Sequence, residues 1–354
     1  MSILLPLFYI IVMVLLEEYM KWGIIGLGKI ANKAAHTLSF LDKEGEKLVA
    51  VASRDLDKAK EFGAKYGAEK CYGSYNEIYN DEDVDSVYIS TPNNLHYEEI
   101  KEALLNGKHV LCEKPMALIP SQYEELYTLA KEKGLFLMEA YWVYFLPGAF
   151  ALRDMSREIG EIEEIFLQYG FYSEGKRRER KFLSALGGGA LLDIGIYNLG
   201  IPEMLGLKNP KILETKVMMN EFGTDKWSET TLLYNNKTKV TTLNAIGLDI
   251  DRIAVIKGER GNIYIPDFQY LTSFRVERDG EKKEYSFPID YNGFEYEMRH
   301  VTECANKGIT SSPIFTKEKS MDIAETLYRI RRLWNMKFEG VDNDYEGKRS
   351  NRES

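Results

Sequence analysis

MKWGIIGLGKIA, residues 20–31, is the stretch that decides the fold. An apolar run ends in a turn with two glycines, and a helical pattern, KIANKAAHTLSFL, follows. The first glycine permits the tight turn, and the second lets the backbone approach a pyrophosphate, whose charge a helix N-terminus favours. Because the motif follows a strand and opens a helix, its context favours a dinucleotide site over a glycine turn that binds nothing. The turn predicts four cofactor-binding residues, Gly26, Gly28, Lys29 and Ile30.

The chain from residue 20 to about 142 alternates apolar strand-like segments with amphipathic helical ones. Strand patterns occur in KLVAVASR, DSVYISTP, HVLCEKP and LFLMEAYW. Helical patterns occur in DLDKAKEFGAKYG, SYNEIYND, NLHYEEIKEALLNGK and SQYEELYTLAKEKG, and we expect the last of these to begin at its serine as a cap. This alternation predicts an α/β Rossmann domain, with a doubly wound parallel sheet, over residues 20–142.

The pattern changes after about residue 143. One helical stretch, GAFALRDMSREIG, is followed by strand-like segments joined by turn residues, among them EIEEIFLQYGFYS, KILETKVMMN, TKVTTLNAIG and RIAVIKG. A last helical stretch, KEKSMDIAETLYRIRRLWN, closes the pattern. We therefore expect an α+β domain with a mostly antiparallel sheet over residues 143–336, and a polar tail over 337–354 that frays from about residue 338.

The N-terminus differs from the rest of the chain. ILLPLFYIIVMVLL, residues 3–16, is apolar throughout, has no basic residues before it and no small-residue cleavage site after it. It is short for a membrane span, and Met20 then opens a normal protein start. We expect residues 1–19 to be a start-site extension rather than an anchor; the alternative is a short hydrophobic tether.

Composition narrows the classes of function. The chain has 354 residues, enough for two domains, with 44% hydrophobic and 29% charged residues, which is ordinary for a globular protein. A net charge of −9 argues against a broad nucleic-acid-binding surface. Three scattered cysteines and four scattered histidines show no spacing for a metal site, so no metal is expected, and free thiols indicate a reducing, cytoplasmic compartment.

The second strand pattern ends in ASRD, where Ser53 and Arg54 stand in the place that an acidic residue usually takes in NAD-binding proteins. An acid there binds the ribose hydroxyls, whereas a guanidinium suits a 2′-phosphate. The sequence therefore favours NADP over NAD. In the alternative interpretation, Arg54 faces solvent while Asp55 caps the next helix.

Two later strand patterns end in STPNNLH and CEKPMAL, and ligands bind at the carboxyl ends of strands in such sheets. A lysine in that crevice, Lys114, is costly unless it is used, and it is suited to hydrogen-bond a substrate hydroxyl and move its proton. Glu113 is suited to hold the lysine in place. The alternative is a surface ion pair before a turn proline. These segments add six expected cofactor-binding residues, Thr91, Pro92, Asn93, His96, Glu113 and Lys114.

The segment LLDIGIYNLG, residues 191–200, places an acid and a phenol in an apolar run. If the segment enters a helix, Asp193 and Tyr197 are four residues apart and share a face. They are candidate catalytic residues with Lys114. The alternative is a helix start, with Asp193 as the cap and Tyr197 as a core aromatic.

Together, GLGKIA, STPNNLHYEEIKEALLNGKHVLCEKPMAL and GGGALLDIGIYNLG resemble the glucose–fructose oxidoreductase / inositol dehydrogenase (Gfo/Idh/MocA) family over about residues 20 to 336. GLFLMEAYW and GGGALLDIGIY are most similar to its dihydrodiol dehydrogenase and D-xylose dehydrogenase branch. The resemblance implies an NADP-type dinucleotide fold joined to a large, open-faced sheet domain that serves in oligomerisation. It also implies that Lys114 is catalytic and that a cis peptide bond precedes Pro115.

The dihydrodiol dehydrogenase branch carries a tyrosine with a proposed acid–base role four residues after the motif aspartate, and Tyr197 takes that position here. The resemblance thus implies that Tyr197 exchanges the substrate hydroxyl proton, while Asp193 hydrogen-bonds a neighbouring hydroxyl or fixes the lysine. A phenol has an ordinary pKa of about 10. We therefore expect the Lys114 cation to lower the pKa of Tyr197.

One departure from the related pattern affects the substrate site. Related dehydrogenases tend to carry an arginine in a WxRF stretch, and Tyr144 stands there in this chain, so we expect a polyol contact or salt bridge to be lost. Arg180, in EGKRRERK (residues 174–181), matches the related pattern and lies in an expected loop that touches substrate or a cofactor phosphate; the alternative is a solvated basic loop. The candidate substrate contacts are Trp142, Tyr172 and Arg180.

Two functions stay open on the sequence. The first is an NADP-dependent oxidoreductase acting on a sugar, a cyclic polyol or a vicinal diol. The second is a non-catalytic regulator that senses a dinucleotide. The lysine–tyrosine pair favours the enzyme, because a pure sensor has no need of it. A large exposed sheet face would be an apolar patch on a monomer, so a homodimer or higher homo-oligomer is expected.

Overall fold

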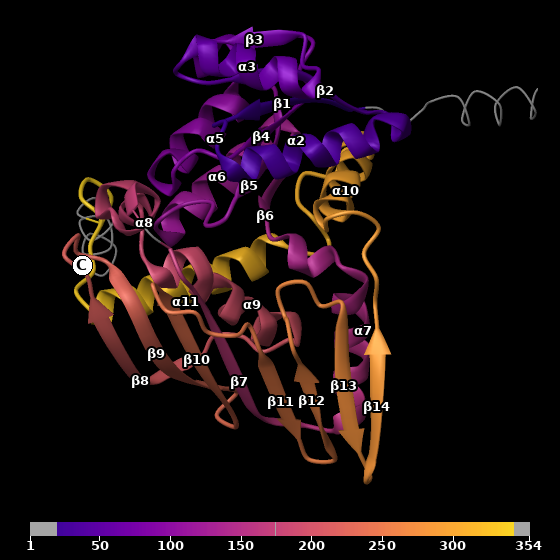
Figure 1. Ribbon diagram of the computed structural model, residues 1–354, viewed down its shortest axis with the longest axis vertical. Coiled ribbons are helices and arrows are strands. Elements are labelled where there is room, and N and C mark those ends of the chain that lie inside the picture. The colour runs from indigo at the N-terminus through magenta and orange to yellow at the C-terminus, as the bar shows by residue number, and fades with distance from the viewer. Residues whose placement is uncertain (1–19, 174, 343–354) are drawn as a thin grey trace, which may run out of the picture.

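The computed structural model of the protein describes residues 20–173 and 175–342 (Figure 1). The extension expected at residues 1–19 and most of the tail expected at 337–354 therefore lie outside the described residues. Two sheets build the described part, one in the upper and one in the lower half of Figure 1. Within that part, no helix combines the length and the apolar character that a membrane span requires.

The first sheet has six strands, all paired in parallel, as the sequence predicts for a Rossmann domain. In the spatial order β3-β2-β1-β4-β5-β6, the strands are Lys70–Tyr72, Glu46–Ala52, Met20–Ile25, Ser86–Ile89, His109–Glu113 and Leu137–Ala140. The helices that alternate with them are α2 (Lys29–Leu41), α3 (Leu56–Tyr66), α4 (Tyr75–Tyr79), α5 (His96–Leu105) and α6 (Pro120–Lys133). Strand β4 is buried along its whole length, as expected where helices cover both faces of a parallel sheet.

Two helix starts test the local predictions. The Asp55 carboxylate caps α3 by accepting hydrogen bonds from the backbone N–H groups of Asp57 and Lys58, at 3.1 and 3.2 Å. The serine start expected for α6 is wrong, because the helix begins one residue earlier, at Pro120. Proline suits the first helical position, since its fixed φ is helical and its missing N–H would have no partner there.

The second sheet has eight strands in the order β14-β13-β12-β11-β7-β10-β9-β8. The pair of β7 (Ile162–Phe171) and β10 (Thr238–Ile246) is parallel, and every other pair of neighbours is antiparallel, which confirms the expected mostly antiparallel sheet. The other strands are β8 (Lys211–Met219), β9 (Asp225–Tyr234), β11 (Ala254–Gly258), β12 (Gly261–Ile265), β13 (Ser273–Arg278) and β14 (Glu281–Ser286). One face packs against α9 (Ile196–Met204), and on the opposite face side chains such as Phe166 and Trp227 are only half-buried.

The C-terminal helices join the two sheets. Helix α10 (Phe294–Asn306), which the sequence patterns did not reveal, returns to the first sheet and packs against α2 (Figure 1). Helix α11 (Lys317–Leu333) packs against both α6 and α9, so it contacts the helical layers of both halves. Helix α7 (Pro147–Met155) follows β6 after a short helical turn, η3 (Trp142–Phe145). The chain therefore passes between the two halves several times.

The start of the tail is packed, and the expectation of fraying from about residue 338 is wrong for residues 338–342. Phe338 and Asp342 are buried, and both carboxylate oxygens of Asp342 accept hydrogen bonds from the Arg331 guanidinium at 2.8 Å. Arg331 also donates to the backbone oxygen of Leu118, at 3.1 Å. A buried ion pair and a buried aromatic ring thus hold a segment whose composition is mostly polar.

Candidate active site

The turn between β1 and α2 has the shape of a dinucleotide cradle. Gly26 has φ +84°, and a Cβ there would lie 2.7 Å from the backbone nitrogen of Thr91, so only glycine fits. A Cβ at Gly28 would meet nothing within 4 Å, and α2 begins directly after it with no side-chain cap. Open space in front of uncapped helical N–H groups fits a pyrophosphate. Of the other two residues expected here, Lys29 is exposed and Ile30 is half-buried.

The loop after β4 forms the second wall of this cradle. Ser90 Oγ donates to the Gly26 backbone oxygen at 2.8 Å, so the loop lies directly against the glycine turn. Thr91 Oγ1 and Asn94 Oδ1 are buried and have no hydrogen-bond partner among the described residues. Buried polar atoms usually find partners, so these two are suited to meet a ligand.

Other residues expected in that loop hold it in place. The His96 ring nitrogens lie 2.8 and 2.9 Å from the backbone oxygens of Pro115 and Thr91, and the side chain is fully buried. Burial lowers the pKa of His96, so the neutral ring donates to one of these oxygens at a time. Asn93 Nδ2 donates to the Gly187 backbone oxygen at 2.8 Å, and Pro92 precedes the short helical turn η2 (Asn93–Leu95). His96 therefore joins the two loops of the site rather than facing a ligand.

At the adenosine end, Arg54 is exposed, and the hydroxyl of Ser53 accepts a hydrogen bond from the Asp55 N–H at 3.2 Å. Burial and Glu99 raise the pKa of Tyr75, while the charges of Arg54 and Arg180 oppose this rise. The charges of both guanidinium groups therefore act on the Tyr75 hydroxyl. Arg180, expected in a loop that touches substrate or a cofactor phosphate, lies in a helix, α8 (Gly175–Phe182), rather than in a loop.

Lys114 and Asp193 meet at the carboxyl end of β5. The peptide bond between Lys114 and Pro115 is cis, as the resemblance implies. Lys114 Nζ donates to the backbone oxygen of Asp193 and lies 3.4 Å from its Oδ1. Lys181 Nζ donates to the other carboxylate oxygen. Burial alone would raise the pKa of Asp193, but the two ammonium groups outweigh it and hold the pKa below its ordinary value. The carboxylate thus stays charged and fixes the lysine.

The glycine run before Asp193 explains how Lys181 comes to be there. A Cβ at Gly188 would lie 2.4 Å from the backbone oxygen of Lys181, and the Gly189 N–H donates to that same oxygen at 2.9 Å. Asp193 itself lies in a π-helical turn, η6 (Leu191–Gly195), which leads into α9. Such turns occur often at functional sites. Sequence reasoning selected Arg180 instead of Lys181, because spacing alone does not say which member of a basic run faces inward.

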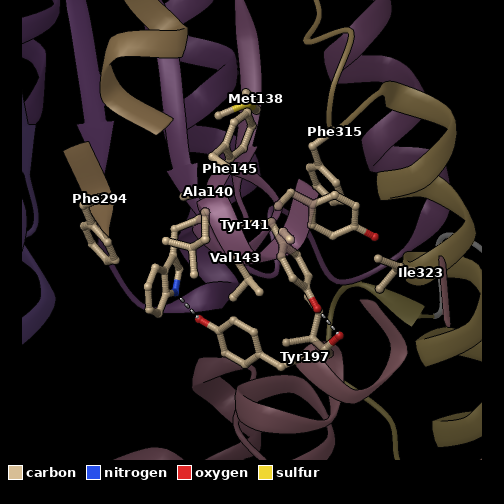
Figure 2. Close-up of a cluster of buried hydrophobic side chains, with 14 of the residues drawn as sticks. Met138, Ala140, Tyr141, Val143, Phe145, Tyr197, Phe294, Phe315 and Ile323 are labelled. Carbon is tan, nitrogen blue, oxygen red and sulfur yellow. Dashed lines mark hydrogen bonds between the residues drawn. The ribbon is translucent and has the colours of Figure 1, made fainter. Parts of the chain in front are cut away.

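Tyr197 lies beside this pair at the start of α9. Its Oη accepts a hydrogen bond from Trp142 Nε1 at 3.3 Å (Figure 2), and Lys114 Nζ lies 4.8 Å from the centre of its ring. The expectation that Lys114 lowers the pKa of Tyr197 is wrong for this state. Burial and the Glu113 carboxyl raise that pKa well above its ordinary value, and hydrogen bonds from Trp142 and Gln269 offset only part of the rise. The phenol is therefore protonated at neutral pH.

Strand β7 and the loops beside β11 and β12 supply a polar network next to Tyr197, because Gln269 also hydrogen-bonds to the Tyr197 hydroxyl. Gln269 Oε1 accepts hydrogen bonds from Tyr169 Oη at 3.2 Å and from Arg252 Nη1 at 2.7 Å. Arg252 also pairs with Asp267 at 2.7 Å. Sequence patterns gave no sign of this network, because its members lie far from the motifs. Tyr172, an expected substrate contact, is 60% exposed.

Tyr144, the departure from the related pattern, has a structural place. It is fully buried, and its Oη donates to Glu203 Oε2 at 2.6 Å and lies 2.9 Å from the backbone oxygen of Gly200. These bonds anchor α9 to η3. Tyr144 thus fixes the helix that carries Tyr197 and does not itself face the site.

Comparisons with known proteins agree with this geometry. The family model described as "Oxidoreductase family, NAD-binding Rossmann fold" (Gfo/Idh/MocA) matches residues 20–141. The trans-1,2-dihydrobenzene-1,2-diol dehydrogenase of Xenopus tropicalis is 34% identical over 319 residues, which cover 87% of this chain and 96% of that protein. The protein of the same name from Homo sapiens is 32% identical, over 90% of this chain and 98% of its own length.

Two solved structures are similar along almost the whole described chain. A 3-ketoreductase from Actinomadura kijaniata, solved with NADP and TDP-benzene, superposes with a TM-score of 0.81 at 25% identity, covering 89% of this chain and 97% of that one. An aldose-aldose oxidoreductase from Caulobacter crescentus, solved with glycerol, gives 0.79 at 26% identity, with 89% and 98% covered. On the identity to relatives aligned over nearly their full length, together with the match of the family model, the chain belongs to the Gfo/Idh/MocA family of oxidoreductases.

Proposed function

We propose that the protein is an NADP-dependent dehydrogenase that acts on a secondary alcohol, or the matching carbonyl, of a sugar, a cyclic polyol or a vicinal diol. The observation that carries this proposal is the meeting of Lys114, Asp193 and Tyr197 in one cluster of half-buried and buried side chains, in the same chain as an open glycine cradle. Relatives named as diol dehydrogenases and sugar oxidoreductases support the substrate class.

The proton chemistry follows from the groups in the cluster. A bound nicotinamide dinucleotide supplies the hydride donor or acceptor. Tyr197, protonated at neutral pH, is set to give its phenolic proton to a substrate carbonyl oxygen, and in alcohol oxidation the same proton returns to it. The Lys114 ammonium against the ring stabilises the phenolate that this transfer leaves. Asp193, held charged by Lys181, keeps the ammonium in position.

The preference for NADP makes Arg54 a specificity residue. Replacing Arg54 with alanine is expected to weaken NADP binding about 10- to 100-fold, because a hydrogen bond to a charged phosphate is lost, while NAD binding stays unchanged. Isothermal titration with each cofactor measures this. Lys58→Ala, an exposed cation on α3, serves as the matched control and is expected to bind both cofactors like the wild type. Equal weakening for both cofactors would contradict the assignment.

We also propose that the protein forms a homodimer through the outer face of the second sheet. Phe166, Trp227 and Leu243 lie half-buried on that face, and pairing two copies would cover them. Sedimentation at micromolar concentration is expected to give a dimer, and Phe166→Arg is expected to shift it towards the monomer. A monomeric wild type would contradict this proposal.

The experiment that tests the function measures NADPH formation by the purified protein against a panel of aldoses, inositols and vicinal diols. NAD is run in parallel, and Lys114→Ala and Tyr197→Phe serve as inactive controls. Turnover that is lost in both variants is the expected result, and it names the substrate class. Turnover that persists in both variants would overturn the catalytic roles.

A further inference from the structure

A second group of ionisable side chains lies buried next to the catalytic cluster, and the proton chemistry above does not use it. Its first member is Lys33, on α2 and one turn beyond the Gly28 cradle. Lys33 Nζ lies 4.2 Å from the ring centre of Trp142 and 3.9 Å from that of Phe294. Burial lowers the pKa of Lys33 to about 8, against opposing charges on Glu297 and Glu113. The ammonium thus lies on an aromatic surface with two carboxyl groups close by.

Glu297, on α10, is the unusual member of this group. Its side chain is fully buried, and neither carboxyl oxygen has a hydrogen-bond partner among the described residues. Burial and the neighbouring Glu113 raise the pKa of Glu297, and Lys33 opposes them. Glu113 by contrast accepts a hydrogen bond from Tyr88. A buried acid with two unused acceptors is costly to keep, and a ligand that donates hydrogen bonds would relieve that cost.

Helix α10 cannot turn Glu297 out to solvent, because it is fixed to the first sheet at both ends. At its start, Asn292 Nδ2 donates to Thr37 Oγ1 on α2 at 2.9 Å. Near its end, Thr302 Oγ1 donates to the buried Glu46 carboxylate at 2.9 Å. The unpaired carboxyl group is therefore preorganised and not the result of a loose helix.

Trp142 shows which part of a ligand would meet this group. The indole N–H donates to Tyr197 Oη, while Lys33 lies over the indole ring. The ring centres of Trp142 and Phe294 lie 5.6 Å apart. The group also lies close to Glu113, the neighbour of Lys114 at the end of β5, because the Glu113 charge acts on both Lys33 and Glu297. It therefore borders the catalytic cluster at the carboxyl end of the first sheet.

We propose that Glu297 and Lys33 bind the carboxamide of the nicotinamide ring, Glu297 accepting its N–H and Lys33 donating to its carbonyl oxygen. This rests on the proposed function, since it needs a nicotinamide cofactor. A carboxamide offers donors and an acceptor together, which matches a carboxyl group beside an ammonium. Two fixed contacts on one substituent determine which face of the ring is turned towards Tyr197, so both are positioning residues.

Binding, rather than turnover, tests this assignment. Titration calorimetry compares three ligands: NADP, its 3-acetylpyridine analogue, which keeps the carbonyl but has no amide N–H, and adenosine 2′,5′-bisphosphate, which has no nicotinamide. The wild type is expected to bind NADP about 10-fold or more tightly than the analogue, because a buried hydrogen bond is lost and the Glu297 carboxyl oxygen is left without a partner. Glu297→Met is expected to bind NADP as weakly as the analogue. Lys33→Met is expected to weaken NADP and the analogue equally.

Two controls separate the loss of a carboxamide contact from a general loss of cofactor binding. Adenosine bisphosphate affinity is expected to stay unchanged in both variants, which shows that the cradle is folded. Glu303→Gln, an exposed acid on the same helix, is expected to match the wild type with all three ligands.

Three outcomes would overturn the inference. If Glu297→Met keeps the wild-type ratio of the affinities for NADP and the analogue, Glu297 does not contact the carboxamide. If Glu297→Met or Lys33→Met raises the KM of the substrate and leaves the NADP affinity unchanged, these two side chains bind a substrate hydroxyl instead. If the wild type does not bind NADP at all, both the proposed function and this inference are wrong.

Discussion

Replacing Lys114 with methionine is expected to lower kcat by about 10³-fold, within the range that a positioned acid–base group contributes. The Lys114 ammonium lies 3.4 Å from the Asp193 Oδ1 and 4.8 Å from the centre of the Tyr197 ring, so its loss removes the cation that would stabilise the phenolate. The fold is expected to persist, because Lys181 still pairs with Asp193. Steady-state kinetics at saturating NADP measure the change.

Lys181→Met is the informative comparison for that result. Its ammonium pairs with the far oxygen of Asp193, and its ring contact is with Phe171 rather than with Tyr197. We expect a loss of about tenfold or less, because the remaining lysine still holds the carboxylate. A Lys114→Met enzyme that retains activity within tenfold of the wild type would contradict the role given to Lys114.

Replacing Asp342 with alanine is expected to lower the free energy of unfolding by about 3–5 kcal/mol. Arg331 and Asp342 are both fully buried, and the carboxylate accepts two hydrogen bonds from the guanidinium at 2.8 Å. Removing the acid leaves a buried cation with no counter-charge. Urea unfolding followed by tryptophan fluorescence measures the difference.

Glu339→Ala is the control for that substitution, because Glu339 is an exposed acid in the same segment. Its effect is expected to be within about 0.5 kcal/mol of zero. The double variant Arg331→Met/Asp342→Leu is expected to recover much of the lost stability, since apolar replacements of a buried pair are often tolerated. A loss below about 1 kcal/mol for Asp342→Ala would show that the pair is not desolvated in solution.

The first sheet was readable from the sequence, because its signals are local. The helix expected from KIANKAAHTLSFL is α2, Lys29–Leu41, with the same bounds. Glycine at the turn, acids in first turns and prolines at strand ends each act within a few residues. The motifs of the candidate site were found for the same reason, since a strand end and a helix start carry them.

The sequence analysis did not predict α10 and α8, because their sequences lack the uninterrupted apolar stripe that usually marks a packed helix. Helix α10 buries Glu295 and Glu297 along with its apolar residues, so its inner face does not look apolar. Helix α8 has a basic sequence without an apolar stripe, so it looked like a loop. The pKa of Tyr197 depends on burial and on a carboxyl group more than eighty residues away in the sequence. Neither effect can be inferred from the residues next to Tyr197.

The return of α10 to the first sheet has a consequence for how this protein can be divided. A fragment ending after β6 would contain every strand of the nucleotide-binding sheet and the whole glycine cradle. It would still lack Thr302, whose hydroxyl completes the shell of the buried Glu46, and it would expose the side of α2 that α10 covers. A complete nucleotide-binding domain is therefore encoded by two separate segments of the gene. Recombination that exchanged only the first segment would transfer the domain without the helix that covers α2.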